Sequence, residues 1–279
     1  SLLEQSMAGQ GGQAEAALAL HTTLESISRT LYGNYNGALN IYNLPTSLMA
    51  AVTAAVIPAV SGALARRDRR GAGRITGSAL RITALVACPM AVGLYVLGKP
   101  IMALIFPSLN ADLAGPLLST LGLATLFVCM MLVCNSVLQA SGFVNLPIVI
   151  MVAGCAAKLI VNNFMVRSVG AVGAAVGTLV CYIIVAVLEL ALIKRVIPAA
   201  PSYGRVFVKP AAAAAVMGLA VWAVYGLLDR FLGNTLSTLG AICVGVLVYA
   251  VLVVALRTIS REDLSLMPKG AKIAEILRL

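Results

Sequence analysis

Seven stretches of the chain are each long and apolar enough to cross a lipid bilayer as a helix. Such a helix needs about 20 apolar residues, because it rises ~1.5 Å per residue through a hydrocarbon core of ~30 Å. The stretches cover roughly residues 35–65, 75–97, 116–140, 145–166, 170–193, 207–228 and 236–256. The segment 99–112 is too short to span and is predicted to form an interfacial turn. The sequence therefore predicts an all-α, polytopic transmembrane helix bundle.

The composition supports helices over a transmembrane barrel. Of the 279 residues, 61% are hydrophobic and 11% are charged, about half the charged share of a soluble domain. Only 5% are aromatic, which favours closely packed helices over strands with aromatic girdles. A net charge of +10 would suit nucleic acid, but the basic residues are distributed as in an oriented membrane protein. No nucleic-acid partner is predicted; the expected partner is the bilayer.

Basic residues concentrate in alternate connections between the predicted spans. Five follow the first span, four lie between the fifth and sixth, and five follow the seventh, so fourteen of the 20 would share one side. These are Arg66, Arg67, Arg69, Arg70, Arg74, Lys194, Arg195, Arg205, Lys209, Arg257, Arg261, Lys269, Lys272 and Arg278. The positive-inside rule places this side in the cytoplasm of a plasma-membrane protein. Residues 1–32 are then an extracytoplasmic leader or loop, and we expect the chain to be a fragment of a longer one with another span before it.

The first span carries a line of four polar side chains. Asn36, Asn40, Asn43 and Ser47 are spaced by four, three and four residues, which places them on one helix face. Four such side chains cannot all face lipid. Hydrogen bonds to neighbouring helices would satisfy them, and so would a water-filled pathway. The regular spacing favours the pathway.

Lys158 lies about 14 Å from the predicted outer end of its span, where a lysine costs ~2.5–3.5 kcal/mol to insert. Asn162 is one turn away on the same face, so this face is expected to be polar or hydrated. Either backbone carbonyls satisfy the ammonium group, or it borders a cavity and meets an anionic ligand. Glu189 of the next span lies more than about 10 Å deeper. It is predicted instead to form a structural ion pair with Arg81.

No enzyme or metal site is indicated by the sequence. The one histidine, His21, lies in the polar leader, and there is no metal-ligand spacing, Walker loop, HExxH or GxSxG motif. The six cysteines lie in apolar segments without a CxxC pair, which is typical of small buried hydrophobic residues. These are Cys88, Cys129, Cys134, Cys155, Cys181 and Cys243. No catalytic residue, metal or cofactor is therefore predicted.

Two blocks of sequence resemble one branch of a transporter superfamily. The stretch "LYGNYNGALNIYNLPTSLMAAVTAAVIPAVSGALARRD" is similar to the eighth transmembrane helix of the stage V sporulation protein B and polysaccharide-exporter branch of the multidrug/oligosaccharidyl-lipid/polysaccharide (MOP) superfamily. Its matching features are Tyr32-Gly33, Leu44-Pro45 and Ile57-Pro58. A later block, residues 137–184, resembles the family in Gln139 with Gly142, Lys158 with Asn162 and Asn163, and the run Gly173 to Thr178.

The resemblance implies the C-terminal lobe of a flippase of the MATE/MOP type. Residues 33–195 would be its second-lobe bundle of five spans, and residues 196–279 two additional spans with a cytoplasmic tail. The N-terminal lobe would be a missing partner, needed to complete a central cavity. By alternating access, such a flippase would move a lipid-linked oligosaccharide or polysaccharide precursor of cell wall or spore cortex to the outer leaflet. Lys158 would attract pyrophosphate, and the asparagine face would meet sugar hydroxyls.

Two other functions are compatible with the sequence. A MATE-type antiporter of drugs or cations would require a membrane-embedded acid, for which Glu189 is the available residue. A non-transporting membrane scaffold for cell-wall synthesis could use the arginine-rich loop 66–74 to recruit partners. That loop is also explained by topology and by contact with anionic lipid.

The predicted orientation can be tested by labelling single cysteines in intact cells, in a variant without the native cysteines. Arg70→Cys and Lys272→Cys should be shielded from an impermeant thiol reagent, because both positions are predicted to be cytoplasmic. Gln10→Cys should react. Labelling of Arg70→Cys would reverse the orientation.

Overall fold

The computed structural model describes residues 2–197 and 203–256, and the secondary structure in these ranges is helical. The helices are α1 (Leu2–Ala65), α2 (Arg69–Val96), α3 (Gly98–Ile105), α4 (Ala111–Ala140), α5 (Asn145–Val169), α6 (Ala171–Val196) and α7 (Tyr203–Ala255). Helix α7 contains two spans, because Gly233 has non-helical dihedral angles (φ 71°, ψ 168°). Seven segments are long and apolar enough to cross a membrane. The predicted all-α polytopic bundle is confirmed.

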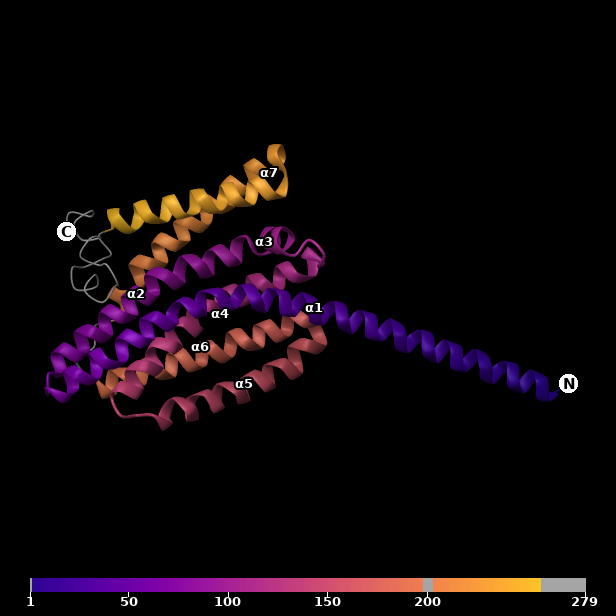
Figure 1. Cartoon of the computed structure of the whole chain (residues 1–279), viewed down its shortest axis with the longest axis horizontal. Coiled ribbons are helices and arrows are strands. Elements are labelled where there is room, and N and C mark those ends of the chain that lie inside the picture. Colours follow the sequence, from indigo (N-terminus) through magenta and orange to yellow (C-terminus); the bar gives the residue numbers. More distant parts are fainter. Residues whose placement is uncertain (1, 198–202, 257–279) are drawn as a thin grey trace.

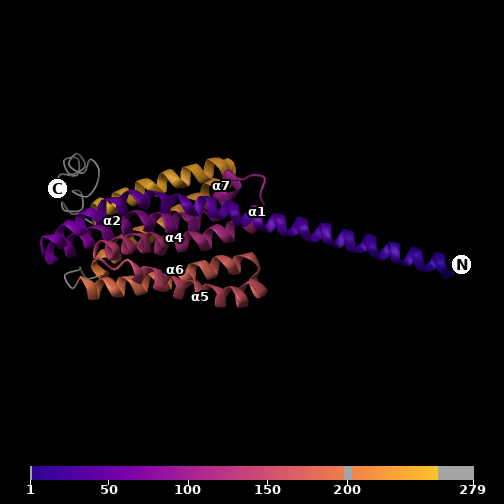
Figure 2. The same cartoon turned by 60° about the horizontal axis from the view of Figure 1, so that its bottom comes forward.

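Helix α4 is the centre of the bundle. It packs against α1, α2, α3 and α6. Of its most apolar 18-residue stretch, 67% is buried, a larger share than in any other described span. Figures 1 and 2 show it enclosed by neighbouring helices. Its first turn is capped by the Asn110 side chain, which accepts a hydrogen bond from the Asp112 amide at 3.0 Å. A helix that is apolar on every side can lie within a bundle or face lipid, and the contacts of α4 with four other helices place it within the bundle.

Helices α2 and α3 and the two spans of α7 form one side of the bundle (Figure 1). Tyr249 of α7 donates its hydroxyl hydrogen bond to the carbonyl of Leu85 on α2 at 2.8 Å. Near the turn between the spans, the Asn234 amide donates to the carbonyl of Pro100 at 3.4 Å. These bonds satisfy polar groups where lipid could not, and so fix α7 on the bundle.

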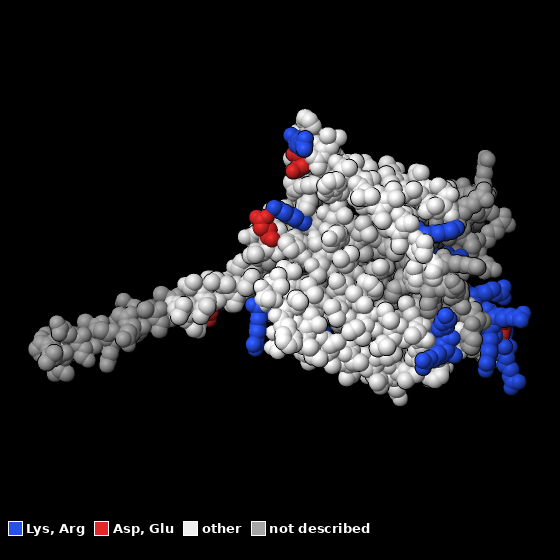
Figure 3. Space-filling model, turned by 180° about the vertical axis from the view of Figure 1, so that it is seen from behind, with Lys and Arg blue, Asp and Glu red and all other residues white. Residues whose placement is uncertain are grey.

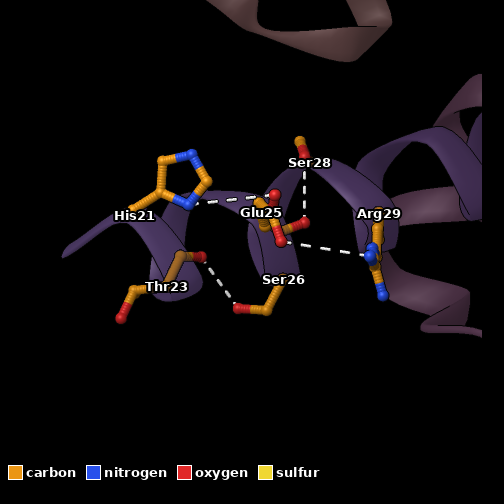
Figure 4. Close-up of polar contacts among 6 residues, drawn as sticks. All are labelled: His21, Thr23, Glu25, Ser26, Ser28 and Arg29. Atoms are coloured by element: carbon orange, nitrogen blue, oxygen red, sulfur yellow. Dashed lines mark hydrogen bonds and ion pairs between the residues drawn. The ribbon is translucent and has the colours of Figure 1, made fainter. Parts of the chain in front are cut away.

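Helix α1 runs without a break from residue 2 through the first span, so the predicted leader 1–32 is helical where it is described. It projects from the bundle in Figure 1. In this part, the carboxylate oxygens of Glu25 lie 3.8 Å from Nδ1 of His21 and 3.9 Å from a guanidinium nitrogen of Arg29 (Figure 4). Both partners are one helical turn from Glu25, and the three side chains are exposed. Such pairs add only about 0.3–0.5 kcal/mol each, but they favour the helix where no tertiary packing does.

Helices α5 and α6 form a hairpin with very close packing. A single residue, Gly170, joins them, and its φ of 65° is one that residues with a Cβ rarely adopt. A Cβ added to Gly173 would collide with the backbone of Met165, and one added to Gly177 would collide with the Asn162 side chain. The predicted close approach at Gly173-x-x-x-Gly177 is confirmed.

Most described members of the basic set lie at one end of the bundle, where Figure 3 shows Lys and Arg side chains gathered. The exposed ones are Arg66, Arg67, Arg69, Arg70, Arg74, Lys194, Arg195 and Lys209. The Arg205 side chain and residues 257–279, with Lys272, lie outside the described part. The alternation of spans thus places these connections together, as predicted, while the side of the membrane they occupy stays a prediction.

The glycine contact predicts a specific loss of stability. Gly173→Leu should destabilise the fold by about 1–3 kcal/mol, because the new side chain meets backbone that cannot move aside. The matched control is Gly93→Leu on α2, where an added Cβ meets nothing within 4 Å. Thermal unfolding of both variants in detergent measures the difference. Equal losses in the two variants would show that the α5–α6 approach is not what matters.

Candidate functional site

The polar line on α1 faces away from the bundle. Asn36, Asn40, Asn43 and Ser47 are all exposed. The opposite face of the same helix is buried, with Ala38 at 0% and Ile41 at 5% exposure. The predicted single helix face is therefore confirmed as geometry. Its role in a pathway is not tested by this geometry alone.

Neighbouring helices do not satisfy these polar groups. Ser47 donates its hydroxyl hydrogen bond within α1, to the Leu44 carbonyl at 2.7 Å. In residues 2–197 and 203–256, no hydrogen bond joins the four side chains to another helix. Leu44 and Leu48 lie on the same exposed side, so the face is mixed polar and apolar. Of the two explanations for the polar line, hydrogen bonding between helices is not observed.

Lys158 and Asn162 lie on the side of α5 that meets α6, and both are half-buried. The Oδ1 atom of Asn162 is buried beside Gly177 and accepts no hydrogen bond. The Lys158 backbone carbonyl oxygen lies 3.4 Å from the position that a Gly177 Cβ would take. The structure therefore brings these two predicted residues together, at the point of closest approach between α5 and α6.

The ammonium group of Lys158 has no hydrogen bond or ion pair with any residue of the described ranges. It lies near enough to Cys181 of α6 to act on it electrostatically. Satisfaction by backbone carbonyls, one of the two predicted possibilities, is not observed. A half-buried, unpaired lysine is available to an anion.

The α1 line and the α5 pair remain separate in this chain. Helix α1 packs on α4 and α2, whereas α5 packs on α6 and touches α4 only slightly. Among the described residues, no hydrogen bond joins Lys158 to Asn36, Asn40 or Asn43. The candidate site is therefore two separate polar surfaces, each open on a side that no described helix covers.

The predicted ion pair between Arg81 and Glu189 is not formed. Neither carboxylate oxygen of Glu189 has a hydrogen-bond partner, although the residue is completely buried. The reason is geometric, since Arg81 belongs to α2, which packs on α1, α4 and α7, while Glu189 belongs to α6. Similar depth in the membrane had suggested the pair, but depth does not tell which helices are neighbours.

The structure also shows polar groups that the sequence analysis did not single out. The Oδ1 atoms of Asn34 on α1 and Asn135 on α4 are buried without a hydrogen-bond partner. Asn135 is an isolated asparagine in an apolar span, which is the signal that could have marked it, whereas Asn34 lies two residues before Asn36 on a different face of α1.

The cysteines are all free thiols. Four are buried as predicted, but the prediction is wrong for Cys155 and Cys243, which are exposed. Among the described residues, no three His, Cys, Asp or Glu side chains gather as metal ligands would. The part of the chain described here thus offers helix surfaces and unpaired polar groups.

Comparison with known proteins identifies the family. The sequence pattern of the lipid II flippase MurJ family matches residues 16–243. The chain belongs to the lipid II flippase MurJ family. A curated relative is the uncharacterized membrane protein YabM of Bacillus subtilis (strain 168), which is 22% identical over 258 residues and matches 90% of this chain. The alignment covers 48% of YabM, so the chain spans about half the length of this relative.

Solved structures show the same fold. An inward closed conformation of the lipid II flippase MurJ matches with a TM-score of 0.67 at 20% identity, over 81% of this chain and 47% of that one. An inward-facing multidrug resistance MATE transporter of the MOP superfamily matches with a TM-score of 0.50 at 17% identity, over 89% and 67% of the two chains. At these identities, the likeness to the MurJ and MATE structures concerns fold.

The polar α1 face predicts a pattern of thiol reactivity. In the full-length protein without native cysteines, Asn40→Cys should react with a water-soluble maleimide roughly tenfold faster than Leu159→Cys, because a thiol ionises in water and not in lipid. Leu159 is a suitable reference, since it is 71% exposed on the apolar side of α5. Ala38→Cys, at a position with 0% exposure, should not react. Equal rates at positions 40 and 159 would place the asparagine line in lipid.

Proposed function

We propose that this chain is the C-terminal lobe of a membrane flippase that carries a lipid-linked oligosaccharide or polysaccharide precursor. The observation that carries this proposal is the exposed asparagine line on α1, which lies within an otherwise apolar membrane helix. Amide side chains at that depth need water, a polar ligand or a polar protein surface. Membership of the MurJ family and the MurJ-like fold support a flippase.

The chemistry of the two polar surfaces fits a sugar-bearing anionic lipid. Amides donate and accept hydrogen bonds, as sugar hydroxyls do, and Asn36, Asn40 and Asn43 present three of them in a row. An ammonium group suits a phosphate or pyrophosphate as a point charge. Lys158 would supply this charge, with Asn162 beside it. Apolar side chains such as Leu44 and Leu48 on the same α1 face would tolerate the lipid chain.

A second lobe is needed to enclose such a substrate. The chain spans about half of its relatives' length, and both polar surfaces are open where no described helix covers them. We place residues 33–195 in the lobe proper and the segment from 196 onward in two additional spans with a tail. The lobes would alternate about the cavity, moving the precursor from the cytoplasmic leaflet to the outer one. The basic end of the bundle would face the cytoplasm.

The class of precursor is the finer part of the proposal. Resemblance of the α1 sequence to the sporulation and polysaccharide-exporter branch favours a cell-wall or spore-cortex precursor. A MATE-type antiporter is the second candidate, supported by the likeness to MATE folds and by the buried carboxyl group of Glu189. An exporter of cationic drugs would not need the unpaired Lys158, which repels cations.

Lys158 provides the test. Lys158→Ala in the full-length protein should lower flux of a lipid-pyrophosphate-sugar about tenfold, the effect of losing ~1.5 kcal/mol from a charge-assisted hydrogen bond. Folded yield should change little, because the group has no hydrogen-bond or ion-pair partner in the described structure. Lys158→Arg should retain partial flux, since the charge remains but its shape differs.

The control is Arg167→Ala, which removes an exposed positive charge from the last turn of the same helix. Flux should be measured in proteoliposomes, separately for the lipid-linked sugar and for a cationic dye. Loss of folded yield without loss of flux per folded molecule would make Lys158 a packing residue. Transport of the dye alone would favour the antiporter.

A further inference from the structure

One buried acid takes no part in the proposed substrate surfaces. Glu189 of α6 has 0% exposure and neither of its oxygens has a hydrogen-bond partner. It lies on the face of α6 that carries Ala186 and Ile193, one turn before and after it, and both belong to the apolar core shared with α4. An ionised carboxylate here would lose several kcal/mol of hydration with no compensating contact.

We propose that Glu189 is a proton-binding site: its carboxyl group is protonated in this conformation and releases the proton when α6 moves on α4 and water reaches it. The step is the simple dissociation of a carboxylic acid, with the proton passing to water and the carboxylate remaining on α6. A neutral carboxyl group is the form of glutamate whose burial costs least when no partner is present. The ligand of this site is therefore a proton.

Among the described residues, no positively charged side chain donates a hydrogen bond to the Glu189 carboxylate. From α4, the titratable group that interacts with Glu189 is the buried thiol of Cys134. On α5 the charged residues are Lys158 and Arg167. Lys158 lies beside Gly177 and Cys181, which precede Glu189 along α6 by about 18 Å and about 12 Å. On α6 itself, Lys194 and Arg195 are exposed. At the start of α7, exposed Lys209 donates to the carbonyl of Leu256 at 3.1 Å.

A metal cation fits this position poorly. Sodium or calcium would need several oxygen ligands around it. Neither Glu189 oxygen has a hydrogen-bond partner, and the described residues hold no group of three His, Cys, Asp or Glu side chains that could bind a metal ion. A proton needs only the carboxylate itself.

The path to water is short and is closed in this conformation. Glu189 is seven residues before the end of α6, about 10 Å along the helix axis. Ile193 and Ile197 follow it at one-turn intervals towards the basic end, with exposures of 0% and 2%. A small displacement of α6 from α4 would open this path. Coupling of the proton to transport rests on the proposed function, whereas protonation of Glu189 does not.

The first experiment tests protonation in the full-length protein in lipid. Infrared spectra at neutral pH should contain a protonated-carboxyl band that Glu189→Gln removes and that the control Asp112→Asn, an exposed acid paired with Lys99, retains. The unfolding midpoint of the wild type should fall as pH rises, because the folded state then holds a proton that the unfolded state has released. Glu189→Gln and Glu189→Met should lack this fall. Absence of the band, or the same fall in both variants, would overturn the proposal.

The second experiment tests coupling. In proteoliposomes, wild-type flux of the lipid-linked sugar should respond to a pH gradient, and Glu189→Gln should fold and lose that response. Flux that responds equally in both would overturn coupling at Glu189, while leaving the flippase intact. No flux of any substrate in the wild type would instead refute the proposed function, and the infrared band would still decide protonation.

Discussion

The central packing of α4 against α1, α2, α3 and α6 is the constraint on which the rest of the bundle depends. Lipid is as apolar as the α4 side chains, so the hydrophobic effect does little to hold helices around it; close packing and the satisfaction of polar groups do. The shared cores built on Leu117, Leu121, Val133 and Leu138 supply the packing. Helices α1, α2 and α6 are placed by this contact, and α5 and α7 are placed by α6 and α2 in turn. The exposed faces of α1 and α5 are what remain once α4 is enclosed.

The spans could be predicted from sequence because hydrocarbon thickness fixes the length of an apolar helix, and the close approach at Gly173 and Gly177 because few other residues permit it. The face of α1 was predictable from spacing alone. The relation of Arg81 to Glu189 could not be predicted in this way. Hydropathy gives the depth of a residue in the membrane, whereas tertiary packing decides which helices are neighbours. The continuous helix through residues 2–32 was missed for a different reason. Polar sequence that contains Gly and Gln suits a loop, but contacts between residues four apart, such as Glu25 with Arg29, support a helix.

The described helices separate two kinds of polarity. On α1 the asparagines are exposed and require a polar partner outside the described helices, such as water, a ligand or further protein. On α6 the carboxyl group of Glu189 is fully buried, and burial without a partner favours its neutral form. Lys158 is intermediate, half-buried at a helix contact and without a counter-ion in the part of the chain described. A transporter needs both kinds. An exposed polar surface binds the substrate, and a buried titratable group stabilises one conformation over another.

The one-residue turn at Gly170 has a mechanical consequence for the α5–α6 hairpin. With no slack in the connection and with glycines allowing backbone contact along the pair, α5 cannot slide past α6 or swing away from it without breaking that contact. The two helices are therefore expected to move as one unit. This unit carries Lys158 and Asn162 on α5 and Glu189 on α6, so a movement of the hairpin would displace all three residues together.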